Sequence, residues 1–154
     1  MNSIMPAIVR IATSADAAAI VRFQILMAKE TEDKDLDPAV VALGVKAVLD
    51  DGQNGFYLVG EVSGKVISSL LITYEWSDWR NRKIWYFQSV FVDRDYRRQG
   101  VFSQMYHAVI AQAQANAVQH VRLYVELDND RAQKVYESLG MQRLPYCMYV
   151  AETS

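Results

Sequence analysis

Residues 93–104, with the sequence DRDYRRQGVFSQ, hold residue types that could bind an anion. Arg97, Arg98 and Gly100 follow a run of aromatic and β-branched residues and precede a segment with helical periodicity. The first N–H groups of a helix have no partner within the helix, and the helix dipole adds partial positive charge there. Glycine lets a phosphate approach the backbone, and arginine adds charge-assisted hydrogen bonds. The stretch is therefore either a phosphate-binding turn or an ordinary strand-to-helix turn that carries basic residues for solubility.

The periodicity of the flanking segments predicts the elements that must position this turn. Alternating apolar residues and runs of β-branched and aromatic residues predict strands at 7–13, 56–62, 66–76, 84–92, 120–127 and, as a strand or hairpin, 141–150. Apolar residues three and four apart predict helices that begin near Thr13 or Ser14, at Asp37-Pro38, near residue 101 and at Asn129, the last ending at Gly140. This order predicts an α/β (α+β) fold with a mixed, mostly antiparallel sheet and helices on both faces.

The bulk composition excludes several classes of protein. A chain of 154 residues with 51% hydrophobic residues is expected to form one domain, residues 1–154. Its formal net charge of -2 gives no general basic field for nucleic acid. No run approaches the ~18 apolar residues of a membrane span, and no secretory signal is evident. The single cysteine, Cys147, forms no internal disulfide, and the few histidines and cysteines form no metal-site pattern, so we expect a cytoplasmic protein without a metal.

Two motifs, RRQGVF at residues 97–102 and NDRAQKVYESLGM at residues 129–141, together resemble the Gcn5-related N-acetyltransferase (GNAT) superfamily. The family has arginine or glutamine, two residues, glycine, one residue, then glycine or alanine at a strand-to-helix turn; here the motif runs from Arg97 to Phe102. A second family pattern matches Asn129, Ala132, Tyr136 and the Leu-Gly-Met at 139–141. The element order is similar to that of the family from about residue 7 to residue 150.

The resemblance implies acetyl-coenzyme A as the co-substrate. Its pyrophosphate would lie on the first N–H groups of the helix, and a bulge in the preceding, splayed strand would free backbone groups for the pantetheine arm and the thioester. The residues that it assigns to this site are Val90, Phe91, Val92, Arg97, Arg98, Gln99, Gly100, Val101, Phe102, Ser103, Asn129, Arg131 and Tyr136. Phe102 departs from the family pattern, but its side chain can point away from the phosphates because only its N–H is needed. Helix capping would equally explain Asn129, and Arg131 also fits a solvated surface residue.

The resemblance also implies direct attack of a neutral amine on the thioester in a ternary complex. Tyr136 is its candidate general acid for the leaving thiolate, although this position also fits the buried face of a helix. Some relatives carry a glutamate on the central strand, whereas this chain has Tyr86-Phe87-Gln88. Tyr86, Gln88 and Glu75 are therefore candidates for a base or for the acceptor site, and a water relay could replace a dedicated base.

The acceptor is expected to be a small cationic amine. The acidic stretch with Glu30 and Glu32 and the aromatic stretch with Trp76 combine carboxylates with a ring for cation–π contact. Solvated loops would explain the same charges. Two alternatives stay open: an enzyme that acetylates a protein lysine or N-terminus, and a non-catalytic acyl-CoA-binding module. A homodimer would be compatible with a final strand that pairs across a sheet edge.

Overall fold

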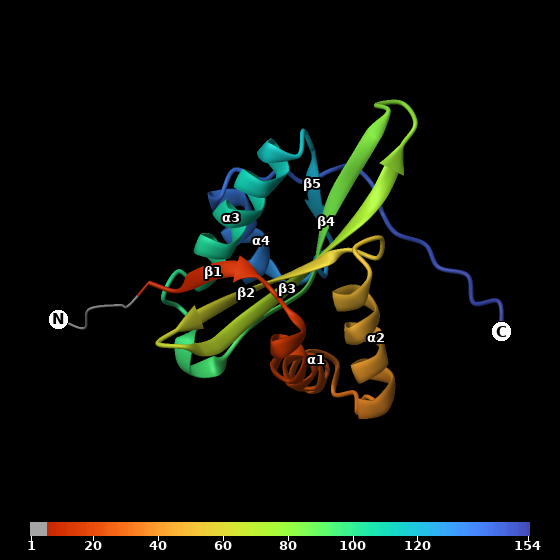
Figure 1. The fold of residues 1–154 in the computed structure, drawn as a ribbon. Helices are drawn as coiled ribbons and strands as arrows, with labels where there is room; N and C mark the ends of the chain where they lie inside the picture. The colour runs from red at the N-terminus through yellow and green to blue at the C-terminus, as the bar shows by residue number, and fades with distance from the viewer. Residues whose placement is uncertain (1–5) are drawn as a thin grey trace. The chain divides into compact units, whose positions relative to one another are not determined.

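The computed structural model describes residues 6–154 (Figure 1). The chain divides into two compact units, one reaching to Tyr124 and the other formed by Val125–Ser154. The first unit holds the sheet and three of the long helices, and the second holds one helix followed by an extended segment.

The first unit is built on a five-stranded sheet with the order β1-β2-β3-β4-β5. Its strands are β1 (Ile8–Ile11), β2 (Phe56–Val62), β3 (Lys65–Ser77), β4 (Arg82–Val92) and β5 (Val121–Leu123). The first four pair antiparallel, and β5 runs parallel to β4. The predicted mixed, mostly antiparallel sheet and its hairpin at 56–76 are confirmed.

Helices cover both faces of this sheet, as the sequence predicts (Figure 1). α1 (Ala17–Glu32) and α2 (Pro38–Asp50) lie on one face, and α3 (Val101–Ala115) lies on the other. The N–H of Ala39 donates to Asp37 Oδ1 at 2.9 Å, which confirms Asp37 as the cap of α2 with Pro38 in its first turn.

Each face of the sheet has its own aromatic and aliphatic packing. Toward α1 and α2, a buried cluster consists of Ile20, Val45, Tyr57 and Val59. Phe23 of α1 stacks on Phe91 of β4 with ring centroids 4.9 Å apart. Toward α3, Phe87 of β4 stacks on Tyr106 with centroids 5.9 Å apart. β4 is therefore buried between both helical layers, which explains its run of large apolar residues.

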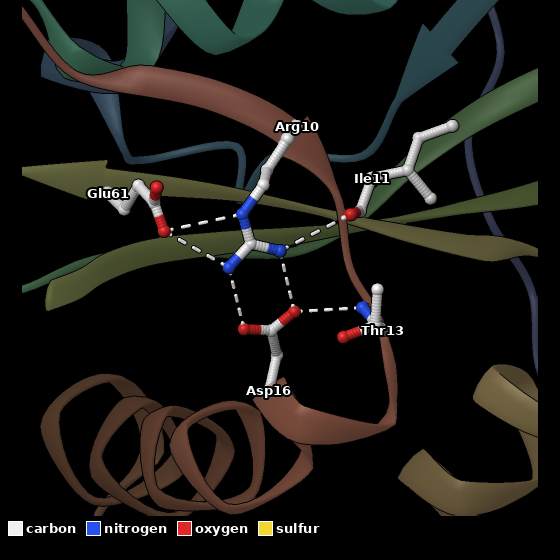
Figure 2. A network of polar contacts seen from close by, with 5 residues as sticks. All are labelled: Arg10, Ile11, Thr13, Asp16 and Glu61. Carbon is white, nitrogen blue, oxygen red and sulfur yellow. Dashed lines mark hydrogen bonds and ion pairs between the residues drawn. The ribbon is translucent and has the colours of Figure 1, made fainter. Parts of the chain in front are cut away.

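An ionic network fixes β1 to the start of α1 (Figure 2). Arg10 donates from Nη1 and Nη2 to both carboxylate oxygens of Asp16, at 2.8 and 2.9 Å, and from Nη2 to Glu61 of β2 at 3.1 Å. The N–H of Thr13 also donates to Asp16 Oδ2, at 2.8 Å. The Arg10 guanidinium holds the pKa of the buried Asp16 carboxyl below its usual value. β1, the turn that opens α1, and β2 are thus joined by one bidentate arginine.

The second unit contains α4 (Asp130–Ser138). The N–H of Ala132 donates to Asn129 Oδ1 at 3.1 Å, so the predicted cap is confirmed. Gly140, with φ of 98°, lies just beyond the helix in a conformation that glycine adopts at little cost. The predicted helix at 129–140 is correct.

Two strand predictions are wrong in extent or existence. The strand expected at 120–127 covers only Val121–Leu123, because the chain turns at 127–128 and the N–H of Asn129 bonds the carbonyl of Glu126. No strand is assigned anywhere in 141–154, where Tyr149 is 92% exposed. Alternating residues make a segment able to join a sheet, but a strand also needs a hydrogen-bonded neighbour.

Candidate functional site

β4 carries a bulge near its end. Ser69 of β3 faces Phe91 and Leu71 faces Gln88, so Leu70 alone stands opposite both Ser89 and Val90. Ser89 has a φ of 51°, in the left-handed region that non-glycine residues rarely enter. The extra residue interrupts the ladder and turns the strand, as a bulge next to a functional site often does.

Beyond this bulge, β4 no longer pairs with β5. The pairing with β5 covers only Trp85, Tyr86 and Phe87, so from Gln88 onward this edge of β4 faces no strand of the first unit. The N–H of Asp93 donates to the carbonyl of Ile67 at 2.8 Å, so the groups of the preceding residue, Val92, point away from β3. The strand thus offers backbone groups on the side where a ligand arm could pair with it.

The chain then enters α3 through a turn with two left-handed residues, Arg98 with φ of 62° and Gly100 with φ of 78°. A Cβ built on Gly100 would meet no atom within 4 Å, so the space beside this residue is open. The N–H of Gln104 donates to the carbonyl of Gly100 at 3.1 Å, which marks the first bond of the helix. The N–H groups of the first turn of α3 come before that bond, and no carbonyl of the helix can accept them. The turn has the form of an anion-binding helix start.

The side chain of Phe102 packs toward the sheet. Its ring lies 6.2 Å from that of Phe87 and 6.4 Å from that of Tyr106, measured between centroids. The residue that departs from the family motif therefore adds apolar contact between α3 and β4. Its bulk is directed into that contact, as the sequence analysis allowed.

The side chain of Arg97, which was expected to bind phosphate, instead binds groups of the protein. Its Nε donates to the carbonyl of Val92 at 2.8 Å, and its Nη2 donates to Glu30 at 2.8 Å. Its guanidinium also lies over the Phe91 ring, 5.4 Å from the centroid. In this structure Arg97 joins the end of β4 to α1, and it occupies both a carbonyl expected for the pantetheine arm and a carboxylate expected for the acceptor.

A second polar cluster joins three adjacent strands on the face that carries α1 and α2. Tyr86 Oη donates to Glu75 Oε1 at 3.4 Å, and Arg122 Nη1 donates to Tyr86 Oη at 3.4 Å. Arg122 Nη1 lies 3.7 Å from Glu75 Oε2. The ring of Tyr124 stacks on that of Tyr86 with centroids 5.3 Å apart. Burial, followed by a hydrogen bond to Tyr86, raises the pKa of Tyr124.

This cluster brings together Glu75 and Tyr86, which the sequence analysis named separately. Gln88 lies two residues along β4, on the same face as Tyr86 and directly before the bulge. Arg122 and Tyr124 were missed. Arg122 is the direct neighbour of Tyr86 in the parallel pair, and strand alternation puts Tyr124 on the same face, so the signal was available once the strand register was known.

Other predicted residues lie on α1 and β3 of the first unit or belong to the second unit. Glu32 pairs with Lys34 at 3.6 Å, and Trp76 is 61% exposed. Asn129, Arg131 and Tyr136 belong to α4 or its cap, and burial raises the pKa of the Tyr136 phenol. Within residues 6–154, no group of three or more histidine, cysteine or acidic side chains is arranged to hold a metal ion. In the same range, every helix is too short or too polar to cross a membrane.

Comparison with known proteins gives these features a family. The model of the acetyltransferase (GNAT) family matches residues 22–141. A solved structure described as a possible acetyltransferase from Clostridium difficile 630 shares 40% identity and a TM-score of 0.90, covering 97% of this chain and 99% of that one. A tetramutant of the BH1408 protein from Bacillus halodurans shares 25% identity and a TM-score of 0.73, covering 94% and 99% of the two chains. A predicted acetyltransferase from Clostridium acetobutylicum, solved with acetyl-CoA, shares 14% identity and a TM-score of 0.76, covering 94% and 96%. The family match over residues 22–141 and the 40% identical structure together show that this chain belongs to the acetyltransferase (GNAT) family.

Proposed function

We propose that this protein is an N-acetyltransferase that moves an acetyl group from acetyl-CoA to a primary amine of a small cationic metabolite. The observation that carries the proposal is a succession along the chain of three features: a bulge at Ser89–Val90, a strand edge that pairs with no strand of the first unit, and the start of α3 at Gly100, which has open space beside it. These three features supply, in order, the groups that a thioester, a pantetheine arm and a pyrophosphate require. A structural neighbour of the same fold was solved with acetyl-CoA, which supports the same donor.

In this proposal the backbone does most of the donor binding. The first N–H groups of α3 bind the pyrophosphate, with Arg98 and Gln99 of the turn as partners at its edge. Binding of the pantetheine arm at Val92 requires either a second lone pair of that carbonyl or release of the Arg97 side chain, whose Nε now lies 2.8 Å from it. A backbone N–H in the bulge, near Val90, polarises the thioester carbonyl.

The reaction is direct transfer within a ternary complex. The neutral amine attacks the thioester carbon, the C–N bond forms and the C–S bond breaks. The thiolate takes a proton from the general acid, and the proton that the attacking nitrogen loses replaces it. Tyr136 is the proposed donor of that proton, because burial raises its pKa and keeps the phenol protonated at neutral pH. Holding both substrates in one orientation supplies much of the rate.

The cationic acceptor is supported by charge and aromatic surface. Glu30 and Glu32 each already pair with a basic side chain at partly exposed positions, and such pairs exchange readily for a ligand cation. Trp76 adds an exposed ring that a cation can approach.

Two measurements test the proposal. Titration calorimetry with coenzyme A should show one site per chain, and release of free thiol from acetyl-CoA should depend on an added amine. The acceptor panel contains spermidine, an aminoglycoside, neutral and acidic amino acids, and lysine and N-terminal peptides. Turnover with the first two supports the proposal, whereas turnover with peptides alone indicates a protein acetyltransferase. Coenzyme A binding without turnover on any acceptor indicates a non-catalytic module, and absence of binding overturns the proposed donor.

A further inference from the structure

We propose that Tyr86 and Glu75 form a proton relay that deprotonates the acceptor amine, with Arg122 positioning the Tyr86 hydroxyl. This inference rests on the proposed amine acetylation and assigns its missing base. The central strand of this chain holds no carboxylate between Ile84 and Val92, so this strand supplies no carboxylate base. The carboxylate is supplied by the neighbouring strand instead.

The donors and acceptors of the cluster fix the direction of its hydrogen bonds. A guanidinium only donates and an ionised carboxylate only accepts. Arg122 Nη1, 3.4 Å from Tyr86 Oη, therefore donates to a lone pair of that oxygen. The single hydrogen of the hydroxyl then points to Glu75 Oε1, which lies 3.4 Å from Tyr86 Oη. These separations are long for hydrogen bonds, and catalytic hydrogen bonds commonly tighten when a substrate binds.

The position of the relay suits an acceptor that approaches the bulge. Tyr86 and Gln88 share one face of β4, and Gln88 is the last paired residue before the bulge. At a rise of roughly 3.3 Å per residue, Tyr86 lies about 7 Å along the strand from Gln88. Tyr86 is 8% exposed, whereas the side chain of Glu75 is 51% exposed. In this proposal the Tyr86 hydroxyl faces the amine, and the exposed Glu75 carboxylate exchanges its proton with water.

The proton balance is complete with these groups. An N–H of the ammonium passes its proton to Tyr86 Oη while the Tyr86 hydroxyl proton passes to a Glu75 oxygen, and Glu75 later releases it to solvent. The freed lone pair of the amine forms the C–N bond, and the C–S bond breaks. The second proton of the attacking nitrogen replaces the one that the general acid gives to the thiolate sulfur. The sum is one ammonium and one acetyl thioester converted to one amide, one thiol and one released proton.

A purely structural role for the cluster makes a different prediction. A substitution that only damages the packing of the site would lower the rate by the same factor at every pH. Such damage does not depend on whether the amine is protonated. A lost relay matters only while the amine arrives protonated, so its effect must shrink as pH rises toward the pKa of the free amine.

The test compares Tyr86→Phe with Tyr74→Phe, using spermidine as the acceptor. Tyr74 neighbours Glu75 in β3 on the opposite face, and its ring packs on Phe56 and Trp85, so it is a matched loss of one phenol. We expect Tyr86→Phe to lower kcat/KM by about 10²-fold at pH 7, a typical contribution of a positioned base, and to move the acidic limb of the pH profile upward. Glu75→Gln should give the same displaced profile, and Asp50→Asn, a surface carboxylate paired with Lys46, should not.

The coenzyme A dissociation constant and the melting temperature of each variant separate the possible results. A pH-independent loss, or no loss, in Tyr86→Phe with unchanged coenzyme A affinity overturns the relay while the proposed acetylation stands. Absence of spermidine turnover in the unaltered protein and on the whole acceptor panel overturns the proposed function and the relay with it. If Tyr86→Phe is unstable, Glu75→Gln alone decides, because its partly exposed side chain carries little of the packing.

Discussion

Arg97 Nη2 lies 2.8 Å from Glu30 Oε2, so the turn before α3 is joined to the last turns of α1 across 67 residues of sequence. The same guanidinium donates to the carbonyl of Val92. The end of the central strand, the turn and a helix on one face of the sheet are therefore held by a single side chain.

Removing this side chain should destabilise the protein more than removing its carboxylate partner. Glu30→Gln should lower the free energy of unfolding by ~0.2–1 kcal/mol, because both groups are partly exposed. Arg97→Ala should cost about 1 kcal/mol more, since it also removes the bond to Val92 and the packing on Phe91. Urea denaturation measures both values. Arg98→Ala is the control, because it removes a neighbouring exposed arginine. An equal decrease in the free energy of unfolding in Arg98→Ala would contradict a stabilising role for the contacts of Arg97.

The open space before α3 can be tested with a matched pair of glycines. Gly100 and Gly64 both have φ of 78°, and a Cβ on either meets no atom within 4 Å. Alanine at each position should therefore cost a similar strain, about 1–2 kcal/mol. Only Gly100→Ala should also weaken coenzyme A binding, by roughly tenfold, because its methyl group would enter the space for the pyrophosphate. Equal dissociation constants for the two variants in calorimetry would argue against this placement.

The Arg10–Asp16 pair should make stability depend on pH in the acidic range. The pKa of Asp16 is lowered in the folded protein, chiefly by its hydrogen bonds with Arg10, from about 3.9 in the unfolded chain. Its stabilising contribution is thus complete above about pH 4 and is lost as pH falls through the lowered, folded pKa. Asp16→Asn should lose ~1–3 kcal/mol at pH 7 and show a flatter decline below pH 4.

Urea denaturation from pH 2 to pH 7 provides the comparison. Asp50→Asn is the control, because its carboxylate pairs with Lys46 on the exposed surface of α2. If the unaltered protein and Asp16→Asn decline in parallel below pH 4, Asp16 is not the group responsible.

Tyr136→Phe should lower kcat by about 10²-fold while the KM for acetyl-CoA stays the same, as expected for a group that acts only in the chemical step. The raised pKa places the loss of this acid above pH 10, so the unaltered enzyme should keep its acid through the neutral range. Steady-state kinetics with spermidine gives both constants. Tyr146→Phe, at an exposed tyrosine of the same unit, should leave them unchanged. An unaltered kcat in Tyr136→Phe would remove Tyr136 as the acid.

The fold was largely predictable because its main signals are local. Asp37-Pro38 indicated the start of α2 through capping chemistry, and the alternating and aromatic residues of 56–92 indicated three strands. The segment 141–150 misled for the same reason that β5 was overestimated: alternation reports which residues can lie in a sheet, and the presence of a partner is a tertiary property. In that segment Tyr146 and Val150 have the side chains that strands favour, yet both are exposed.

The candidate site was predictable in its backbone and poorly predictable in its side chains. The glycine at 100 and the helix after it follow from local conformational preference. Arg97 was expected to face an anion, but its partner Glu30 lies on another element and could not be inferred from spacing. Arg122 and Tyr124 join Tyr86 only through the register of a parallel pair that contains three residues on each strand.

The bulge at Ser89 determines which face of the sheet the later side chains of β4 occupy. Phe87 and Phe91 are four residues apart and would lie on the same face of a regular strand, yet one packs on α3 and the other on α1. The one extra residue of the bulge moves each later residue of β4 to the opposite face of the sheet. Deleting Ser89 should therefore be far more harmful than replacing it, since the deletion would turn Phe91 from the α1 layer to the α3 layer.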